Sequence, residues 1–251
     1  MKAFLLSAGL GTRLAPLTDT IPKCLLPING QPLLQYWLDH VKGTGIEKVL
    51  INTHKHYDQI ESYCKTWTSL PEIILTREQE LLGTAGTLYT NKSFVDGEED
   101  FFLLYADNIT TNVSLSSIYE YHKKKNDSIF TTFAYPTNIP EQKGIFTIDS
   151  NNKVKHFIEK PKNMNGLFGL ANSGIGVLNC EIFDYINNLT FDMGYDIMPR
   201  LINKMYIKLL ETNQKIIDIG TLEDYKLVLK EWGKYDSSSN TITGEFSGRG
   251  V

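Results

Sequence analysis

A glycine-bearing loop follows an apolar run within the first thirty residues of the chain. Ala3-Phe4-Leu5-Leu6 leads into Gly9-Leu10-Gly11-Thr12-Arg13, and Pro22-Lys23 follows shortly after. Glycines let a backbone approach an anion closely, successive N–H groups in a tight turn form an anion-binding concavity, and the two basic side chains add fixed positive charge. The apolar run is typical of a buried parallel strand, at whose end open α/β sheets bind ligands. The feature therefore predicts an α/β fold with a phosphate-binding loop that holds a nucleotide.

Two better-known glycine loops do not fit this segment. A P-loop has four residues between its glycines and Lys-Ser or Lys-Thr directly after, and the chain contains no such segment. A dinucleotide fingerprint needs a third glycine where Leu14 stands, and an acidic residue about 20 positions on, where residues 31–36 instead open a helical pattern. A plain turn is the remaining alternative, and the fixed offsets of Arg13, Lys23 and the prolines argue against it.

Strand-like and helical segments alternate along most of the chain, which predicts an α/β, doubly wound, mostly parallel Rossmann-like sheet. The strand-like segments are 49–52, 72–75, 101–105 and 128–133, and the helical patterns are 33–42, 56–65 and 115–124. Over 144–176 the pattern changes to hairpins, which indicates an inserted β-rich subregion. We expect a single domain at 1–232. A polar tail at 233–251 is expected to fray into solvent or to serve a contact in a homo-oligomer.

Composition excludes several classes of partner. A chain of 251 residues with 41% hydrophobic residues is long enough for a sizeable core, and its net charge of -4 argues against a nucleic-acid surface. No apolar run approaches the length of a membrane span, and the first residues lack the layout of a signal peptide, so we expect a cytoplasmic protein with no membrane partner. Three widely separated cysteines, Cys24, Cys64 and Cys180, predict neither disulfides nor a cysteine metal site.

Segment 6–28 closely resembles the signature of the sugar-1-phosphate nucleotidylyltransferases, and the resemblance extends to about Lys230. Further segments resemble that family's elements in the family's order: a base-recognition loop at 82–86, a first metal-binding strand end at 104–108, sugar-phosphate segments at 157–161 and 171–175, and a second metal-binding element at 218–225. One departure is Ala106-Asp107, where the family usually has Gly-Asp. The resemblance implies the nucleotide-diphospho-sugar transferase type of fold, with 1–232 as its catalytic domain.

The resemblance also implies a set of site residues. Catalysis is expected from Arg13, Lys23, Asp107 and Asp218. The nucleotide is expected to contact Leu6, Ala8, Gly9, Gly11, Thr12, Arg13, Gly83, Thr84, Gly86 and Asp107. The acceptor is expected to contact Gly144, Glu159, Lys160 and Asn172. Asp107 and Asp218 follow apolar runs, and they are expected to bind Mg²⁺, which prefers one or two carboxylates together with phosphate oxygens and water.

The resemblance implies a transferase that joins a nucleoside triphosphate to a sugar 1-phosphate and releases pyrophosphate by in-line displacement at the α-phosphate. Segments 27–33 and 218–221 look most like those of guanylyltransferases for mannose or heptose 1-phosphate, and this resemblance implies GTP with one of these sugar phosphates. UTP, dTTP or CTP with another sugar phosphate, or with a non-sugar acceptor such as phosphocholine, remain open. The alternative from another functional class is a regulator that binds a nucleotide-sugar and has no catalytic activity. The residues expected to act on phosphate and metal are all present, which favours the enzyme.

Overall fold

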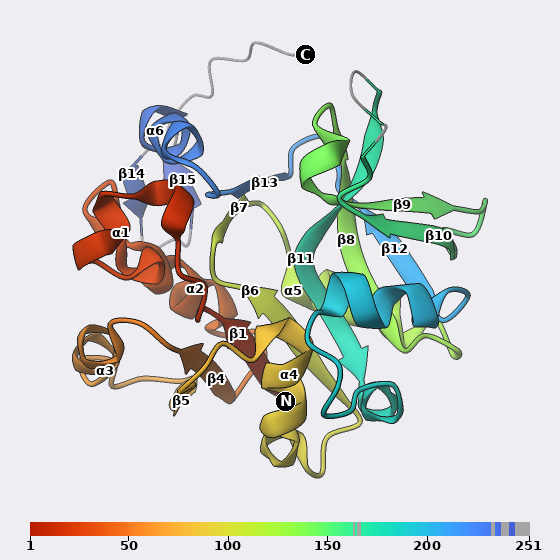
Figure 1. Ribbon diagram of the computed structural model, residues 1–251, viewed down its shortest axis with the longest axis horizontal. Helices are drawn as coiled ribbons and strands as arrows, with labels where there is room; N and C mark the ends of the chain where they lie inside the picture. Colours follow the sequence, from red (N-terminus) through yellow and green to blue (C-terminus); the bar gives the residue numbers. More distant parts are fainter. Residues whose placement is uncertain (163, 165–166, 232–233, 237–240, 244–251) are drawn as a thin grey trace. The chain divides into compact units, whose positions relative to one another are not determined.

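The computed structural model describes residues 1–162, 164, 167–231, 234–236 and 241–243 (Figure 1). The chain divides into two compact units. The first unit comprises Met1–Phe4, Glu80–Leu104 and Ser114–Glu211, and the second comprises Leu5–Gln79, Tyr105–Val113 and Thr212–Val251. Most of the tail expected at 233–251 lies outside the described residues. Within it, β14 (Lys234–Asp236) and β15 (Thr241–Thr243) pair as antiparallel strands. The single domain expected at 1–232 stays a prediction.

The first unit is built mainly on antiparallel strands in the order β10-β9-β11-β6, with β8 paired to β11 and β12 running parallel to β8. These strands are β6 (Asp100–Tyr105), β8 (Phe130–Thr137), β9 (Gly144–Ile148), β10 (Val154–Glu159), β11 (Gly169–Asn179) and β12 (Met205–Leu209). Its helices and helical turns are α4 (Gly83–Thr90), α5 (Leu115–Lys123), η3 (Lys92–Val95), η4 (Pro140–Gln142), η5 (Cys180–Asp184), the π-helical η6 (Met193–Ile197) and η7 (Met198–Leu201). The hairpins predicted over 144–176 are confirmed in β9, β10 and β11.

The second unit contains parallel β4 and β5 and the antiparallel pairs β7 with β13 and β2 with β3. Its strands are the end of β1 (Lys2–Leu6), β2 (Pro27–Ile28), β3 (Gln31–Pro32), β4 (Lys48–Thr53), β5 (Glu72–Arg77), β7 (Asn108–Thr111) and β13 (Lys215–Asp218). Its helices and turns are α1 (Leu17–Thr20), α2 (Leu33–Val41), α3 (Tyr57–Cys64), α6 (Leu222–Glu231), η1 (Thr12–Leu14) and η2 (Lys23–Leu25). The helical patterns predicted at 33–42 and 56–65 correspond to α2 and α3.

Helix boundaries follow local sequence signals. Five apolar residues of α2 at helical spacing are buried, Leu33, Leu34, Trp37, Leu38 and Val41, and the helix ends just before Gly43, whose φ is +77°. Helix α6 begins with a reciprocal cap, in which the Asp224 carboxylate accepts from the Thr221 N–H at 2.8 Å and the Thr221 hydroxyl accepts from the Asp224 N–H at 3.2 Å. This cap fixes the chain directly after β13. Among the described residues, no helix is long and apolar enough to cross a membrane.

A buried polar network in the first unit is centred on Asp100, whose side chain is 1% exposed. Its carboxylate faces His122 Nε2 at 3.3 Å and accepts from Lys123 Nζ at 3.2 Å and Asn179 Nδ2 at 3.0 Å. Burial alone would raise the pKa of Asp100. The hydrogen bonds and charge of its partners outweigh that effect and hold the pKa below its ordinary value. The ionised carboxylate thus ties β6 to α5 and to the end of β11.

Replacing Asp100 with alanine should lower the free energy of unfolding by about 3 kcal/mol near pH 7, because several donors would lose their shared buried acceptor. A carboxyl whose pKa is depressed in the folded state stabilises the protein above its unfolded pKa of about 3.9, and this contribution disappears as pH falls through the folded value. The difference in free energy of unfolding between wild type and variant should therefore narrow as the pH falls below about 4. Urea denaturation across these pH values measures it, and a difference independent of pH would contradict the assigned charge.

Candidate active site

The loop after β1 is held by the neighbouring strand β4. The Ser7 N–H donates to Asn52 Oδ1 at 2.7 Å, and the Ser7 hydroxyl donates to the Asn52 carbonyl at 2.7 Å. Ala106 N–H donates to the Leu6 carbonyl at 2.9 Å, and the Ala106 side chain is buried. These bonds fix where β1 ends and the glycines begin.

Gly11 closes the turn that carries Arg13. Its φ is +64°, and its carbonyl accepts from the Leu14 N–H at 2.8 Å and from the Thr18 hydroxyl at 2.8 Å. A Cβ at Gly11 would lie 2.9 Å from Thr18 Cγ2, so both conformation and space require glycine. A Cβ at Gly9, by contrast, would meet no atom of the described residues within 4 Å. The backbone is therefore open on the Gly9 side, where the sequence predicts phosphate.

Arg13, Lys23 and the two predicted metal-binding aspartates lie in the same unit. The Lys23 ammonium pairs with the Asp107 carboxylate at 2.8 Å, with side chains 12% and 39% exposed respectively. Asp218 stands opposite Asn108 in the β13–β7 register, and the next N–H, of Ile219, donates to the Asp107 carbonyl at 2.9 Å. The two aspartates therefore lie on neighbouring strand ends.

The Arg13 guanidinium lies against the chain that follows Asp218. A Cβ at Gly220 would be 3.3 Å and 3.4 Å from the two terminal guanidinium nitrogens. Glycine at this position lets the cation approach the backbone closely. The signature loop and the second predicted metal-binding element are thus in contact within this unit.

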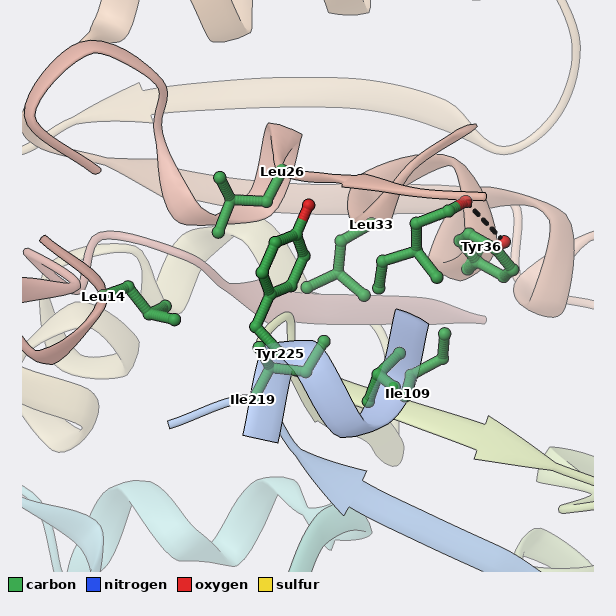
Figure 2. Close-up of a cluster of buried hydrophobic side chains, with 9 residues drawn as sticks. Leu14, Leu26, Leu33, Tyr36, Ile109, Ile219 and Tyr225 are labelled. Carbon is green, nitrogen blue, oxygen red and sulfur yellow. Dashed lines mark hydrogen bonds between the residues drawn. The ribbon is translucent and has the colours of Figure 1, made fainter. Parts of the chain in front are cut away.

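A hydrophobic cluster in the second unit anchors these polar residues (Figure 2). Leu14 follows Arg13, Ile219 follows Asp218, and Ile109 lies two residues after Asp107. All three are at most 2% exposed, and they pack together with Leu26, Ile28, Leu33, Tyr36, Tyr225 and Val228. The Tyr36 hydroxyl donates to the Ile28 carbonyl at 2.9 Å, the dashed bond in Figure 2. Burial of the apolar neighbours therefore determines where each charged side chain emerges.

In the first unit, the loop predicted to recognise the base packs against residues 191–193. The Thr84 hydroxyl donates to Asp192 Oδ2 at 3.2 Å and accepts from the Met193 N–H at 2.7 Å. The Ala85 N–H donates to the Phe191 carbonyl at 3.0 Å. The single hydroxyl proton of Thr84 is therefore used within the protein, which leaves one acceptor lone pair for a base. The sequence predicted no role for 191–193. The only recognisable sequence signal in this segment is Asp192, a residue type that caps helices. Nothing in the sequence links the segment to residues 82–86.

The predicted acceptor residues Gly144 and Glu159 face each other across β9 and β10. A Cβ at Gly144 would lie 2.6 Å from Glu159 Oε2, so the glycine makes room for this carboxylate. Lys160 follows with a φ of +47°, its N–H donates to the Lys143 carbonyl at 3.0 Å, and its ammonium lies 3.9 Å from Glu159. Asn172 in β11 accepts from the Thr132 hydroxyl at 3.0 Å.

Four effects act on the ionisation of Glu159. Burial raises its pKa most, and the negative charge of Asp192 raises it further. The ammonium groups of Lys160 and Lys143 oppose this rise but do not cancel it, so the pKa lies above its ordinary value. The pKa of Glu159 thus depends on charges at three places: Lys143 just before β9, Lys160 just after β10, and Asp192 at the start of η6.

The structure distributes the predicted residues between the two units. The second unit holds the predicted catalytic residues and the first part of the nucleotide set: Leu6, Ala8, Gly9, Gly11, Thr12, Arg13, Lys23, Asp107 and Asp218. The first unit holds the predicted base and acceptor residues: Gly83, Thr84, Gly86, Gly144, Glu159, Lys160 and Asn172. The roles of these residues stay predictions.

The fold and these strand-end residues are typical of α/β nucleotide-binding proteins. Residues 2–232 match the family described as Nucleotidyl transferase. The chain belongs to this nucleotidyl transferase family, and the family predicted from the signature, the sugar-1-phosphate nucleotidylyltransferases, is confirmed.

Curated relatives differ in their named substrates. The chain is 28% identical over 238 residues to a UTP–glucose-1-phosphate uridylyltransferase of Synechocystis, covering 90% of this chain and 61% of that protein. It is 29% identical over 232 residues to mannose-1-phosphate guanylyltransferase 1 of Arabidopsis thaliana, covering 90% and 63%. The chain thus spans about three fifths of the length of these relatives.

The crystal structure of HddC from Yersinia pseudotuberculosis has a similar fold. It aligns with a TM-score of 0.73 at 24% sequence identity, and the alignment covers 91% of this chain and 98% of that one. This agreement supports the fold class predicted from the alternating strands and helices.

Proposed function

We propose that this chain is a sugar-1-phosphate nucleotidylyltransferase. A phosphate oxygen of the sugar 1-phosphate forms a bond to the α-phosphorus of a nucleoside triphosphate, the bond from that phosphorus to the bridging oxygen breaks, and pyrophosphate leaves. The observation that supports this best is the set of charged residues in the second unit. Lys23 pairs with Asp107, and Asp218 lies on the neighbouring strand. Arg13 follows a glycine loop that is open at Gly9. Two carboxylates and two cations together suit the binding of a polyphosphate.

The roles within this proposal follow from charge and position. The backbone of Gly9 and Gly11 and the Arg13 guanidinium bind the β- and γ-phosphates, and Arg13 stabilises the charge that grows on the departing pyrophosphate. Lys23 lies beside Asp107 and neutralises charge near the α-phosphate. No covalent nucleophile is required. Cys24 is buried, and burial raises the pKa of its thiol to about 12, which makes it a poor nucleophile.

Asp107 and Asp218 fit a Mg²⁺ ion that is completed by substrate. Among the described residues, no group of three or more histidine, cysteine or acidic side chains could hold a metal by itself. Mg²⁺ is suited to such a site because it commonly takes one or two carboxylates and fills its remaining positions with phosphate oxygens and water. When bound, the ion would neutralise phosphate charge.

On the acceptor side, Glu159 in its ionised form accepts hydrogen bonds from sugar hydroxyls, and Lys160 binds the phosphate. Asn172 contributes at the hydroxyls. Support comes from the packing of Glu159 against Gly144 and from the position of the Lys160 ammonium next to it. For the pair of substrates we propose GTP with mannose or heptose 1-phosphate. The Arabidopsis relative carries a guanylyltransferase name and the Synechocystis relative a uridylyltransferase name, so UTP with glucose 1-phosphate is the leading competitor.

Pyrophosphate release tests the proposal directly. The full chain would be assayed with Mg²⁺ over a grid of GTP, UTP, dTTP, CTP and ATP against mannose, glucose and heptose 1-phosphates and phosphocholine. We expect release to depend on both substrates, with GTP and mannose or heptose 1-phosphate the best pair. Preference for UTP and glucose 1-phosphate would correct the substrate assignment. No release across the grid, with nucleotide binding intact, would favour a nucleotide-sugar-binding regulator.

A further inference from the structure

Residues 191–196, which we call the Asp192 segment, form a strongly hydrogen-bonded turn in the first unit. Asp192 Oδ1 accepts from the Gly194 N–H at 2.7 Å and from the Tyr195 N–H at 2.9 Å, which caps the π-helical η6. Asp196 Oδ2 in turn accepts from the Phe191 and Asp192 N–H groups at 2.7 and 2.8 Å. Two carboxylates thus hold the backbone of one short segment from both ends.

One side of this segment binds the predicted base loop. Asp192 Oδ2, the oxygen not used in the cap, accepts from the Thr84 hydroxyl. Met193 N–H and the Phe191 carbonyl add bonds to Thr84 and Ala85. The residues joined are more than a hundred positions apart in the chain. The start of α4 is therefore held by the Asp192 segment, in addition to its own helical bonds.

The other side of the segment touches the predicted acceptor carboxylate. A Cβ at Gly194 would lie 2.5 Å from Glu159 Oε2 and 3.1 Å from Asp192 Oδ1. Glycine at this position thus lets Glu159 pack directly against the backbone that Asp192 caps. The segment contacts the two predicted subsites of the first unit at once.

We propose that Asp192 is a positioning residue for both substrates, which holds the base loop through Thr84 and the acceptor carboxylate Glu159 through the capped backbone at Gly194. This inference rests on the proposed function for the roles of the two subsites. The inference goes beyond the proposed function because it assigns to one side chain, that of Asp192, the coupling between nucleotide binding and acceptor binding. A nucleotide that shifts the base loop would move Asp192, and with it the surface on which Glu159 rests.

The charge of Asp192 allows an experiment to distinguish this positioning role from a purely structural role. The charged groups that face Glu159 are Asp192, Lys160 and Lys143, and of these only Asp192 raises its pKa. Asparagine at 192 removes the charge and keeps an oxygen to cap η6. Its amide group takes the place of Oδ2 and can donate to the Thr84 hydroxyl, so the contact with the base loop is kept with its direction reversed. Replacing Asp192 with asparagine should therefore lower the pKa of Glu159 and shift the acid limb of acceptor binding to lower pH. Alanine removes the cap as well, and should also loosen the base loop.

The experiment uses the full chain and four variants: D192N, D192A, G194A and the control D184N, which removes an exposed aspartate at the end of η5. The Glu159 carboxyl is titrated by ¹³C NMR with labelled glutamate, its signal assigned with E159Q. Hydrogen exchange of the Ala85 amide reports on the base loop. Where turnover is present, KM for the acceptor and Kd for GTP and UTP are measured.

We expect D192N to lower the pKa of Glu159 and leave Ala85 exchange near the wild-type rate, while D184N changes neither. D192A should accelerate Ala85 exchange by about tenfold and weaken nucleotide binding by a similar factor, and D192N should largely restore both. G194A should raise the acceptor KM by about tenfold or more, because its Cβ would overlap the position of Glu159 Oε2. An unchanged Glu159 pKa in D192N, or unchanged Ala85 exchange in D192A, would overturn the inference. Both readouts work without turnover, so a silent wild-type enzyme would refute only the proposed function.

Discussion

The substitution Asp218→Asn should lower kcat for pyrophosphate release by about 10³-fold, comparable to the loss of a key charge-stabilising group at a transition state. Asparagine has nearly the same shape as aspartate, and position 218 lies at the partly exposed end of β13. The change therefore removes one of the two carboxylates that we propose bind Mg²⁺, with little change in side-chain shape. The free energy of unfolding should change by less than about 1 kcal/mol.

Asp58→Asn is the matched control, because Asp58 is an exposed aspartate in the first turn of α3 in the same unit. It removes the same charge from the same unit and should leave turnover unchanged. Mg²⁺ dependence adds a second criterion, since the Asp218 variant should need a higher Mg²⁺ concentration for its residual activity. Wild-type turnover in the Asp218 variant would remove this residue from the mechanism.

The parts of the site that the sequence predicted are local ones. The turn at Gly11, the charged residues that follow it and the aspartates after apolar strands can be recognised from a few consecutive residues, because backbone conformation and strand burial depend on near neighbours. The hairpin of β9 and β10 was predicted for the same reason. There, alternating residues flank a turn in which Asp149 Oδ1 accepts from the Asn151 and Lys153 N–H groups at 2.9 and 3.0 Å.

Contacts between distant segments could not be predicted in this way. Thr84 was expected to contact the base, and its hydroxyl donates to Asp192, 108 positions later. Gly144 was expected to contact the acceptor, and in the structure it packs against Glu159, 15 positions later. In both cases the residue type was informative, but its partner depends on tertiary packing. A glycine in the sequence indicates that another group packs closely against the backbone there, but it does not identify that group.

Gly83→Ala should disturb the predicted base loop more than any other single methyl group added to residues 82–86. Gly83 has a φ of +70°, which disfavours alanine by about 1 kcal/mol. The new Cβ would also overlap the Phe191 carbonyl oxygen and lie 2.6 Å from its ring. Because that carbonyl accepts the Ala85 N–H, the clash would separate the loop from the Asp192 segment. We expect the nucleotide Kd to rise by about 10²-fold and the free energy of unfolding to fall by about 3 kcal/mol.

Gly97→Ala separates the two causes of this effect. Gly97 lies in the same unit with a φ of +83°, and a Cβ there would meet no atom of the described residues within 4 Å. This control has the backbone strain without the clash, so it should lose about 1 kcal/mol and bind nucleotide as wild type does. Urea denaturation and calorimetric titration with GTP and UTP measure both quantities. Equal losses in the two variants would mean that the contact between Gly83 and Phe191 does not hold the base loop.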